Sequence, residues 1–378
     1  MNNFDVLIIG GGLHGCSAAL QLAKRGLKPA ILEKNWPGRH ASGVNAGGVR
    51  TLLRDTAEIP LALAARRMWH AIEDLVDDDC GYKTVGQVAV AENDEDLDRL
   101  KARHGVVNQL GHDHEVLIDQ GELREMVPAL ADHCLGGLAV LQDGFASPYH
   151  TTRAFRRKAE AVGATLFEGT RAESMERRGD VWHVRAGDQD FEAPVLINCG
   201  GAWAGECAER LGDTVSFQPI LPMMMVSERL PPLVEPVVIA SGRPLSLKQM
   251  PNGTIVMGGG YLATGELESE RNRINFDGLQ KSAATVADLF PALREVRIVR
   301  CWAGFEGRMA DDIPVIGPSA AAPQAYHAFG FSGHGFQLGP IVGEILADLI
   351  TTGHTDLPIE PFSVERFARP LVPDSEDE

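Results

Sequence analysis

Three glycines near the start of the chain have the spacing of a turn that holds a dinucleotide. Gly10, Gly12 and Gly15 follow the apolar run Val6–Ile9 directly, and residues 16–24 then have the small and aliphatic pattern of a helix. Gly10 permits a tight turn, Gly12 lets the backbone approach a pyrophosphate, and Gly15 allows close packing of helix and strand. The N-terminus of such a helix offers free N–H groups and a partial positive charge to phosphates.

An acid at the end of a second strand completes this motif. Residues 27–32 have the pattern of a short buried strand, and Glu33 follows it, 18 residues after Gly15. An acid at this place can hold a ribose hydroxyl group. The strand, turn, helix, strand and acid together predict dinucleotide binding. A glycine-rich turn in an unrelated α/β fold is the competing interpretation, and for His14 we favour a surface or helix-start position with no catalytic role.

Composition and charge exclude several classes of protein. The 378 residues predict about two domains, at roughly 150 residues each. The net charge of −17, from 35 basic and 52 acidic residues, argues against a nucleic-acid partner. The six cysteines form no C-x-x-C pair, so we expect no metal site and no thioredoxin-like redox pair. The N-terminus has no basic region before its short apolar run, so we expect neither a signal peptide nor a membrane span, and a cytoplasmic protein.

Further strand and glycine-rich segments of a nucleotide-binding type occur far downstream in the sequence. They favour FAD over NAD, because an NAD-binding domain is usually one contiguous block. Residues 194–199 have the pattern of a strand that ends at Gly200-Gly201, followed by Trp203. Residues 329–336 form a glycine-rich segment that precedes an amphipathic helix at about 340–349.

With these motifs the chain resembles the FAD-dependent amine and amino-acid oxidoreductases. This is the superfamily of D-amino-acid oxidase, glycine oxidase and sarcosine oxidase, and the chain is most similar to its sarcosine oxidase β-subunit-like and D-hydroxyproline or opine dehydrogenase branch. The resemblance runs from about residue 4 to about residue 352. Its motifs are residues 10–15, 42–50, 199–203, 302–304, 311–317 and 330–335.

The resemblance implies an α/β fold with a Rossmann-like FAD-binding domain built from discontinuous segments. These segments are residues 1–80, 147–213 and 300–378. An α+β substrate domain with a mainly antiparallel sheet would comprise residues 81–146 and 214–299, and within it residues 245–257 have the pattern of a hairpin.

The resemblance further implies that FAD is held without a covalent bond. Cys301 and His40 lie near the positions where relatives attach the flavin, and they remain the alternative for covalent attachment. The expected FAD-binding residues are Gly10, Gly12, Leu13, His14, Gly15, Glu33, Lys34, Ser42, Asn45, Ala46, Gly47, Gly48, Gly200, Gly201, Trp203, Gly304, Gly330, Gly333, His334, Gly335, Phe336 and Gln337.

The implied reaction is oxidation of a C–N bond to an imine by hydride transfer to flavin N5. The expected substrate is a small secondary amine or D-amino acid, such as sarcosine, D-proline, hydroxy-D-proline or an opine. Glu306 stands where D-amino-acid and glycine oxidases carry an Arg, and Gln337 stands where monomeric sarcosine oxidases carry a Lys. A carboxylate prefers a charged partner, so Arg50, Lys248 and Arg308 are the remaining candidates.

Among these cations Arg50 is the first choice, because it resembles a substrate-side Arg of sarcosine oxidases. A purely structural ion pair is the competing interpretation for Arg50. Alternatively, Glu306 predicts a substrate with a cationic or polar amine group.

Two other functions compete with a self-sufficient amine oxidase or dehydrogenase. Members of the β-like branch often work with partner subunits that carry further redox centres, so the chain is alternatively a partner-dependent or non-catalytic subunit of a heteromeric amine dehydrogenase. Partner redox subunits and self-association both remain open. A tRNA-modifying flavoprotein is disfavoured by the negative charge and the lack of a basic segment.

Overall fold

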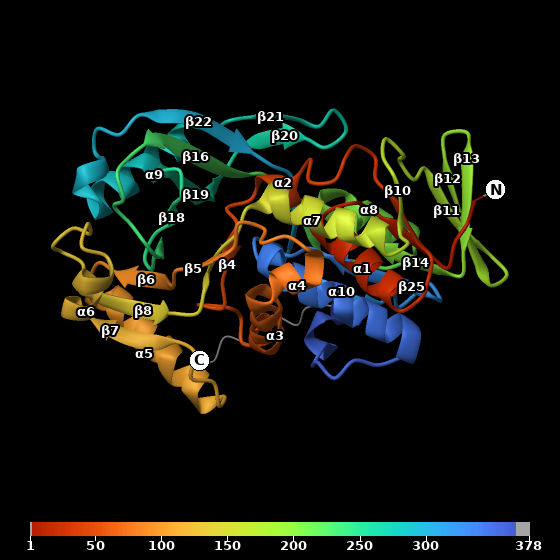
Figure 1. The fold of residues 1–378 in the computed structure, drawn as a ribbon, viewed down its shortest axis with the longest axis horizontal. Helices are drawn as coiled ribbons and strands as arrows, with labels where there is room; N and C mark the ends of the chain where they lie inside the picture. The colour runs from red at the N-terminus through yellow and green to blue at the C-terminus, as the bar shows by residue number, and fades with distance from the viewer. Residues whose placement is uncertain (1, 368–378) are drawn as a thin grey trace, which may run out of the picture. The chain divides into compact units, whose positions relative to one another are not determined.

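The computed structural model describes residues 2–367. The chain packs into two units, each built from separate segments (Figure 1). The first unit comprises the described parts of residues 1–39, 152–219 and 306–378, and the second comprises residues 40–151 and 220–305.

A mostly parallel sheet of six strands forms the centre of the first unit. Its central strands are short runs of aliphatic residues that are almost wholly buried, as expected where helices cover both faces of a parallel sheet. The strand order is β10-β3-β2-β14-β25-β24, parallel throughout except for β24. The bounds are Val6–Ile9 (β2), Pro29–Leu32 (β3), Thr165–Phe167 (β10), Val195–Asn198 (β14), Val315–Pro318 (β24) and Ala325–Phe329 (β25).

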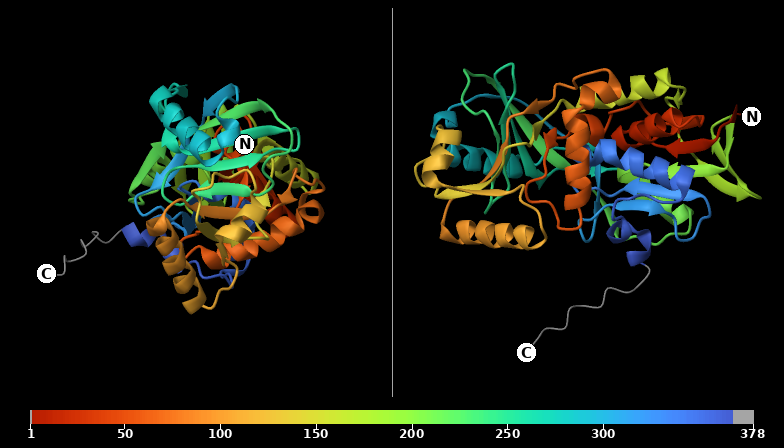
Figure 2. Two further views of the ribbon diagram at one scale, coloured as in Figure 1. Left: turned by 90° about the vertical axis from the view of Figure 1, so that its left-hand side faces the viewer. Right: turned by 60° about the horizontal axis from the view of Figure 1, so that its bottom comes forward.

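Helices α1 (Leu13–Lys24) and α10 (Gly335–Thr352) lie side by side in this unit (Figures 1 and 2). Glycines permit this close approach. A Cβ atom added at Gly339 would lie 2.5 Å from Leu13 Cδ2, and one added at Gly343 would lie 2.2 Å from Ser17 Oγ. The N-termini of both helices follow glycine-rich turns at the ends of sheet strands, β2 for α1 and β25 for α10.

Smaller elements complete the first unit. A four-stranded sheet in the order β1-β13-β12-β11 packs Trp182 and Phe191 into a core with Leu7 of β2. The remaining bounds are Asn2–Asn3 (β1), Ser174–Arg178 (β11), Val181–Ala186 (β12), Gln189–Ala193 (β13), Gly201–Trp203 (η1), Ala204–Arg210 (α8), Phe217–Ile220 (β15), Glu306–Met309 (β23), Glu360–Phe362 (η3) and Val364–Phe367 (η4). Helix α7 (Pro148–Ala161) runs from the second unit into the first.

An eight-stranded sheet dominates the second unit. Its order is β22-β16-β19-β18-β17-β6-β8-β7, and only β17 and β6 are parallel. Strands β18 and β19 form the hairpin predicted within residues 245–257. The bounds are Gln87–Ala91 (β6), Val116–Asp119 (β7), Gly136–Val140 (β8), Pro222–Arg229 (β16), Val237–Ala240 (β17), Ser246–Gln249 (β18), Thr254–Leu262 (β19) and Ile298–Ala303 (β22).

Helices and short strands surround this sheet. Helices α6 and α9 contact β8 and β19, and Leu123 of α6 joins Leu289 and Phe290 in the core of the unit. The bounds are Ala41–Val44 (α2), Gly48–Val49 (β4), Ile59–His70 (α3), Ile72–Val76 (α4), Lys83–Thr84 (β5), Asp94–Gln109 (α5), Gln120–Met126 (α6), Gly144–Phe145 (β9), Thr264–Glu266 (β20), Arg271–Arg273 (β21), Phe276–Leu289 (α9) and Pro291–Leu293 (η2).

The architecture confirms the predicted α/β fold class, with a largely parallel sheet in one unit and a largely antiparallel sheet in the other. The units differ from the expected domain ranges mainly in residues 40–80, which group with the second unit. The reason is local packing, since β4 pairs with β9 and Asp143 binds the backbone of Thr51 and Leu52.

The described residues contain neither a helix suited to span a membrane nor a cluster of metal-ligating side chains. Within residues 2–367, no helix has both the length and the apolar character needed to cross a membrane. In the same range, no group of three His, Cys, Asp or Glu side chains is arranged to hold a metal ion.

Candidate cofactor and substrate site

The turn between β2 and α1 has the backbone that the glycine spacing predicts. Gly10 has φ +104°, and a Cβ atom added there would lie 2.3 Å from the carbonyl oxygen of Cys199. A Cβ atom added at Gly15 would lie 2.0 Å from the carbonyl oxygen of Gly10. Gly12 is the N-cap of α1 and supplies no side-chain cap. The N-terminus of α1 therefore directs the positive end of the helix dipole towards the place where a phosphate group is expected.

Glu33 lies against this turn at the end of β3 and is 9% exposed. One carboxylate oxygen accepts from the Gly11 N–H at 2.7 Å and the other from the Asn35 N–H at 2.8 Å. Glu33 therefore holds the turn in place, and it lies where a ribose is expected. Beside it, the Lys34 ammonium lies 3.1 Å from the ring centroid of Trp203, so two further predicted residues come together.

The glycine-rich segment before α10 contacts the first turn of α1. The His14 ring stacks on Phe331 with centroids 3.8 Å apart and planes at 4°, and it hydrogen-bonds to the backbone of Gly335. Burial lowers the pKa of His14 to about 3, so the ring is neutral at ordinary pH. Gly330 and Gly333 have φ +72° and +89°, which favour glycine. Two of the segments predicted to hold FAD, residues 10–15 and 330–337, are therefore adjacent in the first unit.

Three predicted residues near this segment have distinct environments. Gln337 is fully buried on α10. Glu306 is half-buried, and its Oε1 accepts from the Gly333 N–H at 2.6 Å; burial raises its pKa. Arg308 is held by both carboxylate oxygens of Asp312, at 2.6 and 2.9 Å. A guanidinium engaged in this bidentate pair is a weaker candidate for a substrate carboxylate.

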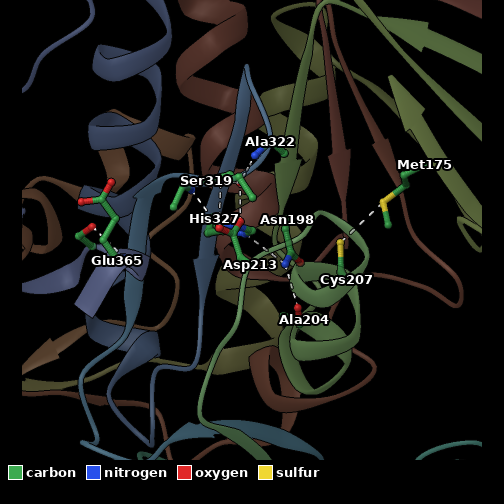
Figure 3. A network of polar contacts seen from close by, with 12 residues as sticks. Met175, Asn198, Ala204, Cys207, Asp213, Ser319, Ala322, His327 and Glu365 are labelled. Carbon is green, nitrogen blue, oxygen red and sulfur yellow. Dashed lines mark hydrogen bonds and ion pairs between the residues drawn. The ribbon is translucent and has the colours of Figure 1, made fainter. Parts of the chain in front are cut away.

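A buried network that the sequence did not reveal supports the Gly200-Gly201 turn (Figure 3). Asn198, at the end of β14, donates to the Ala204 carbonyl and accepts from the Gly200 N–H, at 2.9 and 3.1 Å. His327 lies beside Asn198 and bonds to Asp213 at 2.8 Å. Its members come from strands and loops far apart in sequence, so only the paired positions of β14 and β25 could have indicated it.

Hydrogen bonding sets the charge of that network. Burial raises the pKa of Asp213, but hydrogen bonds from His327 and Ser319 outweigh it and leave the pKa below its usual range. Ser319 bonds to Asp213 (Figure 3). This arrangement around Asp213 is typical of a structural anchor and not of a nucleophile that a histidine activates.

In the second unit, the predicted flavin-binding segment at residues 42–49 is held by one of its own side chains and by two side chains from distant parts of the chain. Asn45 donates to the Ala41 carbonyl at 2.8 Å and accepts from the Gly47 N–H at 2.7 Å. The Trp302 indole donates to the Val44 carbonyl at 2.8 Å, and Lys248 donates to the Ala46 carbonyl.

Two glycines allow this packing. A Cβ atom added at Gly47 would lie 2.3 Å from the Ala146 carbonyl oxygen, and one added at Gly304 would lie 2.1 Å from Val44 Cγ2. The His40 ring hydrogen-bonds to Glu270 at 3.0 Å, and Cys301 is half-buried in β22. Both alternatives for covalent flavin attachment therefore lie in the second unit.

Lys248 is a buried cation and Arg50 is a half-buried one. Within residues 2–367 neither of them forms an ion pair. Lys248 is 4% exposed, its ammonium lies 4.8 Å from the ring centroid of Phe145, and burial lowers its pKa to about 7. Arg50 donates to the Leu52 carbonyl at 2.9 Å, and burial lowers its pKa.

Two buried carboxylates hold the backbone that carries Arg50. Asp143 accepts from the N–H groups of Thr51 and Leu52, at 2.7 and 3.0 Å. Glu115 accepts from the Leu53 N–H at 2.7 Å and is paired with Arg103. Leu53 has φ +54°, a conformation that costs free energy for a residue other than glycine. Sequence reasoning missed these supports because they come from distant segments.

Comparison with known proteins identifies the family. Residues 5–349 match the family described as FAD dependent oxidoreductase, and the chain belongs to it. The protein is accordingly an FAD-dependent oxidoreductase, as the resemblance implied.

Individual relatives align over nearly the whole chain. The chain is 27% identical to a glycine oxidase of Geobacillus kaustophilus over 97% of each chain. It is 25% identical to the sarcosine oxidase subunit beta of Rhizobium meliloti, with 98% of this chain and 90% of the relative covered. The crystal structure of L-proline dehydrogenase from P. horikoshii superposes with a TM-score of 0.91 at 27% identity, over 97% and 98% of the two chains.

Proposed function

We propose that the protein oxidises the C–N bond of a small secondary amine or D-amino acid to an imine. The sarcosine, D-proline, hydroxy-D-proline and opine types are the candidate substrates. The observation that carries the proposal is Arg50, a half-buried guanidinium without a carboxylate partner in the described chain. Asp143, Glu58 and Glu115 attract this charge from a distance, but Arg50 forms no ion pair within residues 2–367. A cation that is partly removed from water in this way favours an anionic ligand. The named substrates of the relatives, glycine, sarcosine and proline, support a carboxylate-bearing amine.

The described residues fit FAD. The backbone at Gly10 and Gly15 leaves no room for a Cβ atom, and the N-terminus of α1 would present the positive end of its dipole to the pyrophosphate. Glu33 would hold a ribose hydroxyl, and the segments at 42–49 and 330–337 would hold the flavin without a covalent bond. The N-terminus of α10 would stabilise negative charge that develops on reduction. When bound, FAD supplies the acceptor for the hydride of the substrate C–H bond.

The chain's own part in the reaction is to bind and orient the substrate. Arg50 would bind the carboxylate, preferably through two parallel N–H···O bonds. Lys248 would place a second positive charge in the same unit, and its low pKa makes that charge dependent on pH near neutrality. Arg308 has a lesser claim, because Asp312 already occupies its guanidinium.

Replacement of Arg50 tests the carboxylate assignment. Arg50→Ala should raise the Kd of an amino-acid substrate at least about tenfold, since a charge-assisted hydrogen bond contributes roughly 1.5–3 kcal/mol. Arg50→Lys should recover part of the affinity. The measurement is the substrate dependence of flavin reduction in an anaerobic stopped-flow instrument. The matched control is Arg124→Ala on α6, an exposed guanidinium paired with Asp132. An unchanged Kd in Arg50→Ala would reject the assignment.

A partner-dependent role is the second candidate. The similarity to a sarcosine oxidase subunit beta favours it, since that relative is named as a subunit of a larger enzyme. In this case the isolated chain would be reduced by the amine but would pass its electrons on only through a redox subunit or another copy of the chain. For either candidate function we propose a location in the cytoplasm.

A further inference from the structure

Glu306 occupies an unusual place for a carboxylate. It is the first residue of β23, and it bonds through Oε1 to the Gly333 N–H at 2.6 Å. Gly333 belongs to the turn between β25 and α10, in which Ser332 and Gly333 both have positive φ angles. Glu306 is thus attached to the glycine segment of the first unit that is proposed to hold the flavin.

Among residues 2–367, no cation forms an ion pair with this carboxylate. Within the described residues of the first unit Glu306 forms no ion pair, and Arg308, two residues along the strand, is bound by Asp312. Burial raises the pKa of Glu306 and the bond from Gly333 lowers it to a lesser degree, while no charged side chain contributes. Buried carboxylates are normally paired with a cation or neutralised. Glu306 is half-buried, so its carboxylate loses part of its hydration without gaining a cation from the described residues. A ligand cation would supply that partner.

We propose that Glu306 binds the cationic nitrogen of the substrate and accepts its proton. This rests on the proposed function and narrows its substrate class to small amines that arrive as ammonium ions. The ammonium N–H would donate to the carboxylate of Glu306. In the proton transfer, one N–H bond breaks and an O–H bond forms on Glu306, while the nitrogen keeps the electron pair. The neutral amine that results is the form from which a hydride can leave the adjacent carbon.

Two matched probes test the charge preference without any turnover. tert-Butylammonium carries an N–H cation but no hydrogen on the carbon beside nitrogen, so it cannot be oxidised by hydride loss. Pivalate carries the same tert-butyl group next to a negatively charged carboxylate. Both are titrated into the oxidised holoenzyme, and binding is followed by the change in flavin absorption. In the wild type, tert-butylammonium should bind, and pivalate reports separately on the binding of an anion.

Glu306→Gln separates charge from structure. The Gln side chain keeps the length and the oxygen that accepts from Gly333, so the turn should persist, with retained FAD and unchanged thermal unfolding as the check. The variant should weaken tert-butylammonium binding at least tenfold and leave pivalate binding equal or stronger. Glu306→Ala removes the acceptor as well and should reproduce the loss of cation binding. The control is Glu122→Gln, because Glu122 also accepts a backbone N–H, from Asp119 at 2.8 Å.

The pH dependence gives a second readout. Protonation of Glu306 should weaken tert-butylammonium binding as the pH falls through its pKa, which burial raises above the ordinary range of a carboxyl group. Glu306→Gln should abolish this dependence. Equal effects of Glu306→Gln on both probes, or no effect on either, would overturn the proposal in favour of a turn-holding role. If no amine reduces the flavin while Glu306→Gln still impairs tert-butylammonium binding, the proposed function fails and the cation site stands.

Discussion

At the scale of single residues, the burial of Lys248 lowers the pKa of its ammonium group and so makes its charge depend on pH. Its ammonium is 4% exposed, and desolvation lowers its pKa to about 7, against 10.5 in the unfolded chain. Between these two values the unfolded state binds more protons than the folded state, so the free energy of unfolding rises with pH. The burial cost is therefore complete below about pH 7 and declines from there towards pH 10.5.

Lys248→Met should remove this cost. We expect the substitution to stabilise the protein more at pH 6 than at pH 9, with a difference on the order of 2 kcal/mol. The measurement is urea unfolding at both pH values, with Lys101→Met as control, since Lys101 is an exposed lysine of α5. An equal effect at the two pH values would show that Lys248 has an ordinary pKa.

The sequence indicates candidate site residues but does not indicate which residues they contact. Sequence reasoning selected Arg50, Lys248, Glu306 and Arg308 by type and motif position, but their partners come from the fold. Arg308 pairs with Asp312 because a tight turn, with Asp312 at φ +58°, brings the two together. Glu306 meets Gly333 across 27 positions of sequence. No local pattern encodes such contacts.

At the scale of elements, the turn from β2 to α1 is the feature on which cofactor binding depends. A methyl group at position 15 would collide with the Gly10 carbonyl at 2.0 Å. Gly15→Ala must therefore displace backbone atoms that hold the pyrophosphate in the proposed site.

We expect Gly15→Ala to raise the dissociation constant of FAD at least tenfold, because the misplaced N–H groups lose charge-assisted hydrogen bonds worth roughly 1.5–3 kcal/mol. Flavin fluorescence measures the affinity after reconstitution. Gly105→Ala is the control, because an added Cβ at this position of α5 has nothing within 4 Å. It should keep FAD and raise stability by about 0.5–1 kcal/mol. Equal FAD affinity in both variants would contradict the proposed role of the turn.

Elements with local signals were predictable. The strand, glycine turn and helix at residues 6–24 were visible because burial and periodicity are properties of neighbouring residues. The network of Asn198, Asp213 and His327 was not visible, because pairing of β14 with β25 creates it.

At the scale of the whole molecule, motifs and resemblance correctly indicated the α/β fold and the family. The compact units divide the chain differently from the expected domain ranges, which stay a prediction. Residues 40–80 contain the motif at residues 42–50, yet a hydrogen bond to Asp143 and one from Lys248 join them to other parts of the second unit. The negative net charge argues against a nucleic-acid partner, and the absence of a C-x-x-C pair argues against a thioredoxin-like redox pair. Neither property indicates which substrate Arg50 and Glu306 would bind.

The visible spectrum of the purified protein, recorded without oxygen before and after addition of small amines, tests the central claim most directly. The panel contains sarcosine, both prolines, hydroxy-D-proline, an opine and several D-amino acids. The account predicts a yellow protein whose flavin absorption is bleached by at least one of these compounds. A protein that binds FAD and is reduced by dithionite, yet by none of the amines, would contradict it.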